Sequence, residues 1–331
     1  MSPNRADIAH ALADALMGRA YEDAGNYVAA ARFYRQAATR GLALGQYYLG
    51  SLALAGLGVP HDDAEAARWF RRAGEQEHTT AQVLLGVMYH RGQGVTRDYP
   101  EAARWFHRAA AQGHSHAQYS LGLMYSSGQG VPLNKTVAIS WYRLAAAQGH
   151  PTAAHNLGLK YLQGHEVRKD MGTALGFLHQ AAEFGLPDSQ YLVGYIYRMG
   201  EEIPKDPAEA HHWFSLAAKQ GHAGGQVSLG LMYLRGQGVS QDSLQAVRWF
   251  RAAADQGDAD GQLNLAMAYW FGLGVSRDPL EAYLWATLSA EQHNEDAVEL
   301  QAAIRQDLPA AHASKAQRLA QAWKAKAKPR K

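Results

Sequence analysis

The sequence predicts an all-α solenoid of helix pairs, because one 36-residue pattern recurs along most of its 331 residues. Three observations support this prediction: the period itself, a glycine that ends the first helix of each copy, and a capping residue that begins the second. Self-similarity at a period of about 20 to 50 residues is typical of proteins whose units stack on their neighbours. The composition agrees, since 47% of the residues are apolar and 19% are charged, as in globular proteins.

The period is regular and has no insertion or deletion. Seven consecutive copies cover residues 45–296. Position 1, the first residue of each copy, is occupied by Gly45, Ala81, Ala117, Ala153, Ser189, Gly225 and Gly261. Position 22 is alanine in all seven copies, position 25 is Trp or Phe in all seven, and position 9 is tyrosine in six. We expect these recurring side chains to form the core between stacked units.

The first helix of each copy is expected to span about eleven residues and to end at glycine in position 12. Glycine adopts the left-handed conformation that ends many helices without a steric cost. A G-x-G-V loop follows in five copies, whereas Glu166 and Glu202 replace its second glycine. We therefore expect these two loops to differ from the others in conformation.

The second helix begins with a capping residue at position 18, which is aspartate in six copies and Asn134 in one. In four copies a glutamate follows three residues later, which predicts a reciprocal capping box. The aromatic residue at position 25 is expected to fill the space between the helices, so that Trp141→Ala would cost about 3–5 kcal/mol of stability.

Residues 85–113 carry the pattern L-G-x-x-Y-x-x-G-x-G-V-x-x-D-x-x-x-A-x-x-W-F-x-x-A-A-x-Q-G. This pattern resembles the Sel1-like repeat, a relative of the tetratricopeptide repeat. The resemblance implies a right-handed α/α superhelical solenoid of helix-turn-helix repeats, whose first helices line a concave groove. It also implies a bacterial adaptor that binds proteins.

The chain is expected to have three parts. Residues 1–44 look like a tetratricopeptide-like capping unit, residues 45–296 are the seven tandem repeats, and residues 297–331 form C-terminal capping helices with a basic tail. Two helices are expected in the last part, over 297–305 and 309–327. A terminal repeat needs a polar outer face, and Lys315, Arg318, Gln321 and Lys324 can supply it.

Partner-binding residues are sought where copies differ, because packing does not fix those positions. Positions 3, 10 and 11 vary and mix aromatic residues with arginine, types that are enriched at binding hot spots. The predicted partner-binding residues of the groove are Tyr47, His90, Arg91, Tyr119, His155, Tyr191, Arg198, Arg235, Trp270 and Phe271. A second interpretation stays open, in which several of these side chains pack against the next repeat and the arginines are simply solvated.

The sequence offers little for catalysis. It has no cysteine, which excludes thiol nucleophiles and thiolate metal sites. Its 16 histidines include four at position 34, for which turn packing is expected, and no H-E-x-x-H motif. We therefore predict no enzyme activity, no catalytic residues, no cofactor and no metal.

Charge and targeting features complete the prediction. Residues 315–331 carry seven of the 32 Lys and Arg residues and no acid, which leaves 25 basic and 30 acidic residues elsewhere. We expect no nucleic-acid partner, no membrane span, a cytoplasmic location, and a basic tail able to contact an acidic partner. The predicted function is a scaffold that binds a protein or peptide. The alternatives are an immunity or regulatory protein that sequesters an effector, a β-lactamase- or peptidoglycan-type hydrolase, and an RNA-binding helical repeat.

Overall fold

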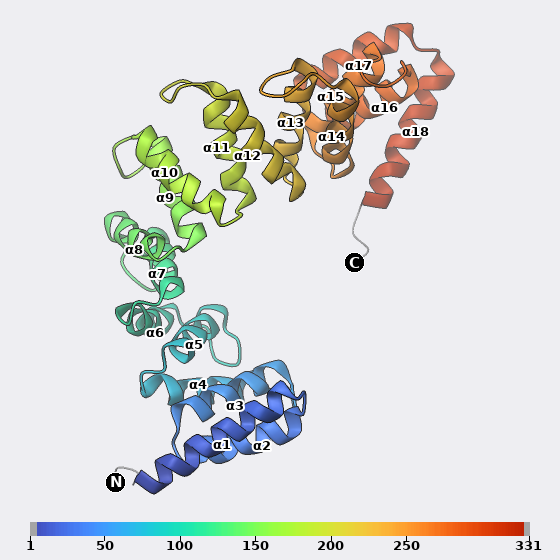
Figure 1. Ribbon diagram of the computed structural model, residues 1–331. Coiled ribbons are helices and arrows are strands. Elements are labelled where there is room, and N and C mark those ends of the chain that lie inside the picture. The colour runs from blue at the N-terminus through green and yellow to red at the C-terminus, as the bar shows by residue number, and fades with distance from the viewer. Residues whose placement is uncertain (1–4, 328–331) are drawn as a thin grey trace. The chain divides into compact units, whose positions relative to one another are not determined.

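The computed structural model describes residues 5–327, over which the chain forms 18 helices and no strand. The chain divides into two compact units, residues 1–157 (unit 1) and 158–331 (unit 2). Unit 1 contains α1 (Arg5–Asp23), α2 (Tyr27–Thr39), α3 (Ala43–Ala55), α4 (Asp63–Glu75), α5 (Thr79–Arg91), α6 (Tyr99–Ala111), α7 (Ser115–Ser127) and α8 (Lys135–Ala147) (Figure 1).

Unit 2 continues the same succession of helix pairs to the C-terminal cap. It contains α10 (Met171–Glu183), α11 (Pro187–Met199), α12 (Pro207–Lys219), α13 (Ala223–Arg235), α14 (Ser243–Asp255), α15 (Ala259–Phe271), α16 (Pro279–Ala290), α17 (Glu295–Asp307) and α18 (Ala310–Ala327). The boundary between the units falls inside α9 (Pro151–Gln163). The two helices expected at the C-terminus are confirmed as α17 and α18.

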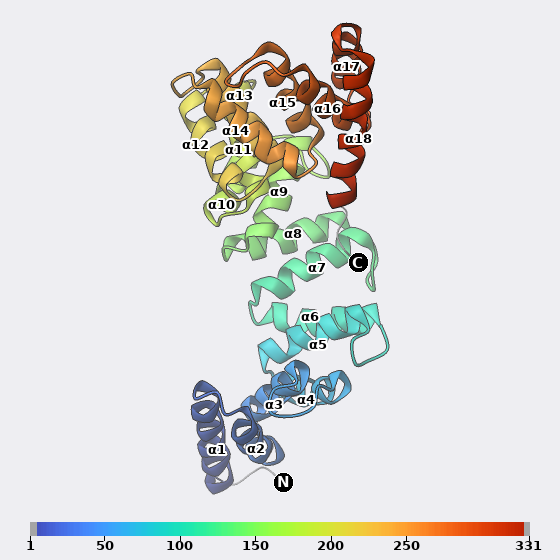
Figure 2. The ribbon, with the colours of Figure 1, turned by 90° about the vertical axis from the view of Figure 1, so that its right-hand side faces the viewer.

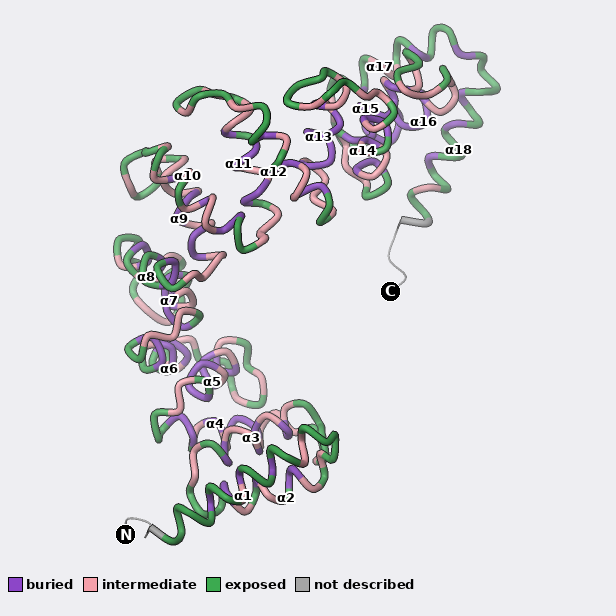
Figure 3. Tube along the Cα trace, viewed as in Figure 1, coloured by how far each residue is buried: buried purple, intermediate pink, exposed green. Residues whose placement is uncertain are grey.

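Most helices that follow one another in the chain pack side by side within each unit, whereas α18 packs on α16 (Figure 2). Buried residues concentrate along the helices and exposed residues concentrate in the loops (Figure 3). In unit 2 the first helices of successive copies also touch, as α13 and α15 do. The all-α repeat architecture expected from the 36-residue period is confirmed.

The loop after the first helix follows the glycine pattern with one correction. The position-12 glycines whose C-cap geometry is described adopt the left-handed conformation, for example Gly92 at φ 74°. At the second loop position Glu166 also has φ 68°, so the expectation of a different conformation there was wrong. Glu202 does not share that left-handed backbone. The loop thus imposes its φ on Glu166 at a steric cost that glycine would not incur.

Only one of the two hydrogen bonds of the expected capping box forms at the second helix, as the copy with Asp98 illustrates. The side chain of Asp98 accepts a hydrogen bond from the backbone N–H of Glu101 at 3.0 Å. The predicted reciprocal hydrogen bond, from the backbone N–H of Asp98 to the Glu101 carboxylate, was wrong. The Glu101 carboxylate instead accepts a hydrogen bond from the Trp105 indole N–H at 2.9 Å. The backbone N–H of Asp98 donates instead to the carbonyl of Tyr89. The glutamate therefore satisfies the buried indole rather than the helix terminus.

The deepest aromatic position is one residue later than expected. Phe70, Phe214 and Phe250, all at position 26, are at most 1% exposed. At position 25 the exposure varies, and Trp141 is only half-buried. We therefore revise the expected cost of Trp141→Ala downwards, since a half-exposed ring loses less apolar burial.

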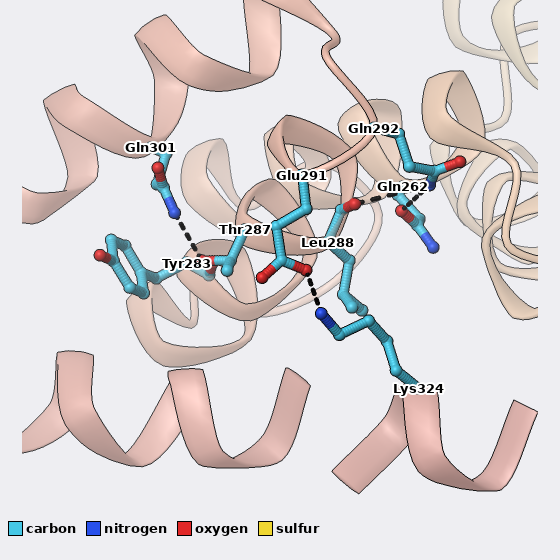
Figure 4. Close-up of polar contacts among 8 residues, drawn as sticks. All are labelled: Gln262, Tyr283, Thr287, Leu288, Glu291, Gln292, Gln301 and Lys324. Atoms are coloured by element: carbon cyan, nitrogen blue, oxygen red, sulfur yellow. Dashed lines mark hydrogen bonds and ion pairs between the residues drawn. The ribbon is translucent and has the colours of Figure 1, made fainter. Parts of the chain in front are cut away.

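A pair of glutamines links the two ends of most copies. Position 2 is a buried glutamine whose amide donates to a carbonyl of the preceding helix, as Gln118 does to Ala110 at 3.4 Å. Its side-chain oxygen accepts from the glutamine at position 32, as from Gln148 at 2.7 Å. Six copies have this pair, at Gln46–Gln76, Gln82–Gln112, Gln118–Gln148, Gln190–Gln220, Gln226–Gln256 and Gln262–Gln292. Figure 4 shows the last of them, Gln262–Gln292. The remaining copy loses both members together, to Ala154 and Phe184.

The glutamine pair should contribute measurably to stability. Gln118→Ala removes two hydrogen bonds of about 0.5–1.5 kcal/mol each, so the free energy of unfolding is expected to fall by about 1–3 kcal/mol. Urea unfolding followed by circular dichroism measures this change. Gln163→Ala is the control, because Gln163 is exposed; equal losses in the two variants would show that the pair is not a structural link.

The C-terminal cap closes the last copy with aromatic and polar contacts. Trp323 of α18 packs edge-on against Trp285 of α16 at 6.0 Å between ring centroids. Lys324 donates to Glu291 at 2.8 Å, and Gln301 donates to Thr287 at 2.8 Å (Figure 4). The last residues of the predicted basic tail, 328–331, lie outside the described residues.

Candidate protein-binding face

One face of the first helices stays open in every copy. Position 11 is exposed in all seven, at Ala55, Arg91, Ser127, Gln163, Met199, Arg235 and Phe271. Position 7 is never fully buried, and it is occupied by Ser51, Val87, Leu123, Leu159, Tyr195, Leu231 and Met267. Because residues four apart share one helix face, positions 7 and 11 form a continuous row on each first helix, which we call the open stripe.

Position 3 is largely a packing position. The ring of Tyr47 stacks on His78 at 4.5 Å between ring centroids. The equivalent pairs Tyr119–His150 and Tyr191–His222 stack at 4.6 and 4.8 Å. All three tyrosines and His155 are half-buried, and the valine or leucine of the other copies is buried. These contacts favour the interpretation that position 3 supports the fold.

The histidines at position 34 cap the helix that follows them. Nδ1 of His78 accepts a hydrogen bond from the backbone N–H of Ala81 at 3.3 Å, and His150 does the same for Ala153. His114, whose copy has Val83 in place of the tyrosine, forms no such cap. Tyrosine at position 3 and a capping histidine thus occur together, which supports the predicted role in turn packing.

Burial of the capping histidines makes stability depend on pH. Burial lowers the pKa of both His78 and His150 below the ordinary value of 6.5. The unfolded chain therefore binds more protons in acid, and the histidines' contribution to stability is lost as the pH falls below about 6.5. The melting temperature is expected to drop between pH 7.5 and pH 5.5.

The control for this pH dependence comes from the chain itself. Asn294 occupies the same position in the last copy and caps the next helix without titrating. His78→Asn/His150→Asn should therefore melt with a shallower dependence on pH than the wild type. Identical slopes would contradict a role for the two histidine caps.

Position 10 is half-buried and engaged in contacts. The guanidinium of Arg198 lies over the rings of Tyr195 and Phe214, at 5.2 and 5.6 Å. Arg277 covers Trp270 at 4.6 Å. His90 lies edge-on to the ring of Tyr99, with 5.2 Å between centroids. These side chains are available to a partner in part only.

Two predicted residues meet at an apolar pocket between α13 and α15. Arg235 and Phe271 line this pocket of about 290 Å³ together with side chains of both helices. Phe271 is 61% exposed. Sequence reasoning missed the other stripe residues at this pocket, Leu231 and Met267, because an apolar residue between two buried positions resembles a core residue.

A second pocket of about 260 Å³ lies between α9 and α11, within unit 2. Its lining includes Leu192, Tyr195 and Met199. Lys169, which also lines it, is paired with Glu202 at 2.7 Å. The open stripe of unit 2 therefore carries two recesses with apolar walls.

The described residues form neither a metal site nor a membrane-spanning helix. Within the part of the chain that the structure describes, no three His, Asp or Glu side chains gather as a metal site would require. Among the same residues, no helix combines the length and the apolar character needed to cross a membrane.

The stacked helix pairs define an all-α helical-repeat protein. The family model of the Sel1 repeat matches eight segments, residues 9–42, 43–78, 79–114, 115–150, 151–185, 187–222, 223–258 and 259–294. The chain belongs to the Sel1 repeat family, whose members generally serve as scaffolds for protein–protein interaction. The matches begin at the first helices, two residues before the copies counted above, and include the N-terminal helix pair.

Two solved bacterial structures resemble the chain over most of its length. A Sel1 repeat protein from Oxalobacter formigenes is 34% identical with a TM-score of 0.69, covering 89% of this chain and 87% of that one. A protective antigen of uropathogenic Escherichia coli strains, which displays the same repeat fold, is 28% identical with a TM-score of 0.62, covering 95% and 84%. No curated protein matches the sequence.

Proposed function

We propose that the chain is a non-catalytic adaptor that holds a partner protein or peptide along its open stripe. The observation that supports this is that packed and exposed side chains occupy different positions of the repeat. Recurring residues are used in packing, whereas positions 7 and 11 expose side chains that differ from copy to copy. Exposed apolar side chains that gather in one row are typical of interaction surfaces.

Direct contacts to the partner come from Arg91, Arg235 and Phe271, because all three are exposed on the open stripe. Position 7 contributes further contacts, since Leu123 and Tyr195 are 41% and 38% exposed. The three stacked tyrosines at position 3 serve mainly as supports in this proposal. A cytoplasmic location and a three-part division into cap, repeats and tail stay predictions from the sequence.

Affinity capture tests the proposal. The tagged chain is incubated with a lysate of its native cell, and bound proteins are quantified by mass spectrometry. The stripe variant Leu123→Glu/Tyr195→Glu/Met267→Glu places charge on the open stripe. We expect it to lose the specific partners by tenfold or more, because a buried unpaired carboxylate disfavours binding.

The control places two glutamates, rather than three, on second helices. Leu144 of α8 and Leu244 of α14 are 50% and 51% exposed, so Leu144→Glu/Leu244→Glu alters the surface to a similar degree. This variant should retain the partners. If the stripe variant stays helical and keeps the same partners as this control, the open stripe is not the binding face.

A further inference from the structure

We propose that the partner is an acidic peptide segment that inserts one bulky apolar side chain into the pocket between α13 and α15, beside Arg235. This anchor pocket is lined by Leu231, Leu234, Met267, Phe271 and Leu273, with Arg235 among them. The inference rests on the proposed function and narrows it to one pocket and one chemistry.

The anchor pocket is large enough to hold one bulky side chain. Its volume of about 290 Å³ lies just below the range of about 300–1,000 Å³ that is usual for small-molecule sites. Its walls come from leucine, methionine and phenylalanine side chains, and Phe271 and Leu273 are 61% and 37% exposed. An inserted aromatic or leucine side chain would remove this apolar surface from water, which favours binding.

The charge at the anchor pocket selects an acidic partner. Arg235 is exposed, and no carboxylate among the described residues lies within ion-pair distance of it. No acidic side chain lines the pocket. A guanidinium binds a carboxylate through paired hydrogen bonds, so a partner acid next to the apolar anchor completes the contact.

The neighbouring recess between α9 and α11 has the opposite charge pattern. There the one cation, Lys169, already pairs with Glu202, and Glu201 adds a further carboxylate. This recess can accept an apolar side chain but offers no unpaired cation. The preference for acid in the partner therefore comes from Arg235 at the anchor pocket.

Peptide selection tests the inference directly. The whole chain is immobilised and used to select from an unbiased phage library of random peptides. We expect enrichment of sequences with Trp, Phe or Leu and an Asp or Glu within a few residues. A synthetic peptide of the enriched sequence should bind Phe271→Ala and Arg235→Glu at least tenfold more weakly than the wild type.

Charge reversal supplies the matched control. Selection on Arg235→Glu should shift the enriched sequences from acidic to basic residues. Arg248 is an exposed arginine of the second helix α14 and does not line the anchor pocket, so Arg248→Glu should leave the acidic preference unchanged. Enrichment without acidic residues, failure to enrich any sequence, or an unchanged preference on Arg235→Glu would overturn the inference. It would also be overturned if light scattering showed that the chain self-associates and that the peptide dissociates it, since the occupant would then be a second copy.

The stripe variant separates this inference from the proposed function. Peptides that bind the stripe variant as well as the wild type would contradict the open stripe as the binding face. Peptides that bind the stripe variant more weakly but bind Arg235→Glu as well as the wild type would support the open stripe as the binding face. They would contradict only the proposed contact between Arg235 and an acidic residue of the partner.

Discussion

Phe250→Ala is expected to lower the free energy of unfolding by about 3–5 kcal/mol, the cost of emptying a large buried site. Phe250 is 1% exposed and packs in the core of unit 2. Its ring lies directly against the backbone of Gly230 in α13, so few atoms can move in to fill the space. Chemical denaturation followed by tryptophan fluorescence and circular dichroism measures the loss.

The neighbouring Trp249→Ala gives the matched comparison in the same helix. Trp249 is larger than Phe250 but only half-buried, so its removal should cost clearly less. The opposite ranking would mean that position 25, as the sequence suggested, carries more of the core than position 26.

Gly230→Ala is expected to destabilise the fold by about 1–3 kcal/mol, as overpacking does. At an uncrowded helix position, Gly→Ala stabilises by about 1 kcal/mol. The sign of the change in free energy of unfolding therefore shows whether the added methyl group clashes with the ring. A Cβ at Gly230 would lie 2.5 Å from the Phe250 ring, closer than two carbon atoms can approach. The same denaturation measurement gives the change.

The next copy shows how the clash can be relieved. There the equivalent positions are Ala266 and Ala286, both fully buried. In the background of Phe250→Ala, Gly230→Ala should therefore cost much less, or even stabilise. Additive effects of the two substitutions would contradict direct contact between the ring and the glycine.

Much of the fold could be predicted from the sequence because the same physical requirement recurs in every copy. The glycine after the first helix, the aspartate cap and the small residue at position 22 each solve a local problem of backbone or packing. Their recurrence identifies them without any structure. The period also predicted the number of helix pairs between residues 45 and 296.

The errors arose where a residue's contacts in the fold differ from those that its local motif suggests. The indole of Trp105 competes for the carboxylate of Glu101, and sequence spacing alone assigned that carboxylate to the helix terminus. The Gln118–Gln148 link joins residues 30 apart, so the recurring glutamines alone did not predict it. The left-handed backbone of Glu166 shows that the loop geometry persists without its glycine.

The candidate site was predicted only in part. Variation between copies correctly drew attention to position 11, where Arg235 and Phe271 are exposed. It also selected Tyr119, whose stacking on His150 depends on a partner 31 residues later. Position 7 was overlooked because Leu123 and Met267 look like core residues, and only the fold shows which side of the helix they occupy.

Hydrogen–deuterium exchange of the chain with and without its captured partner tests the central claim most directly. Partner binding is expected to slow exchange along the first helices that carry the open stripe, above all in α13 and α15 around the anchor pocket. The second helices α8 and α14 should exchange as they do in the free chain. Protection confined to the second helices, with the first helices unchanged, would contradict the account.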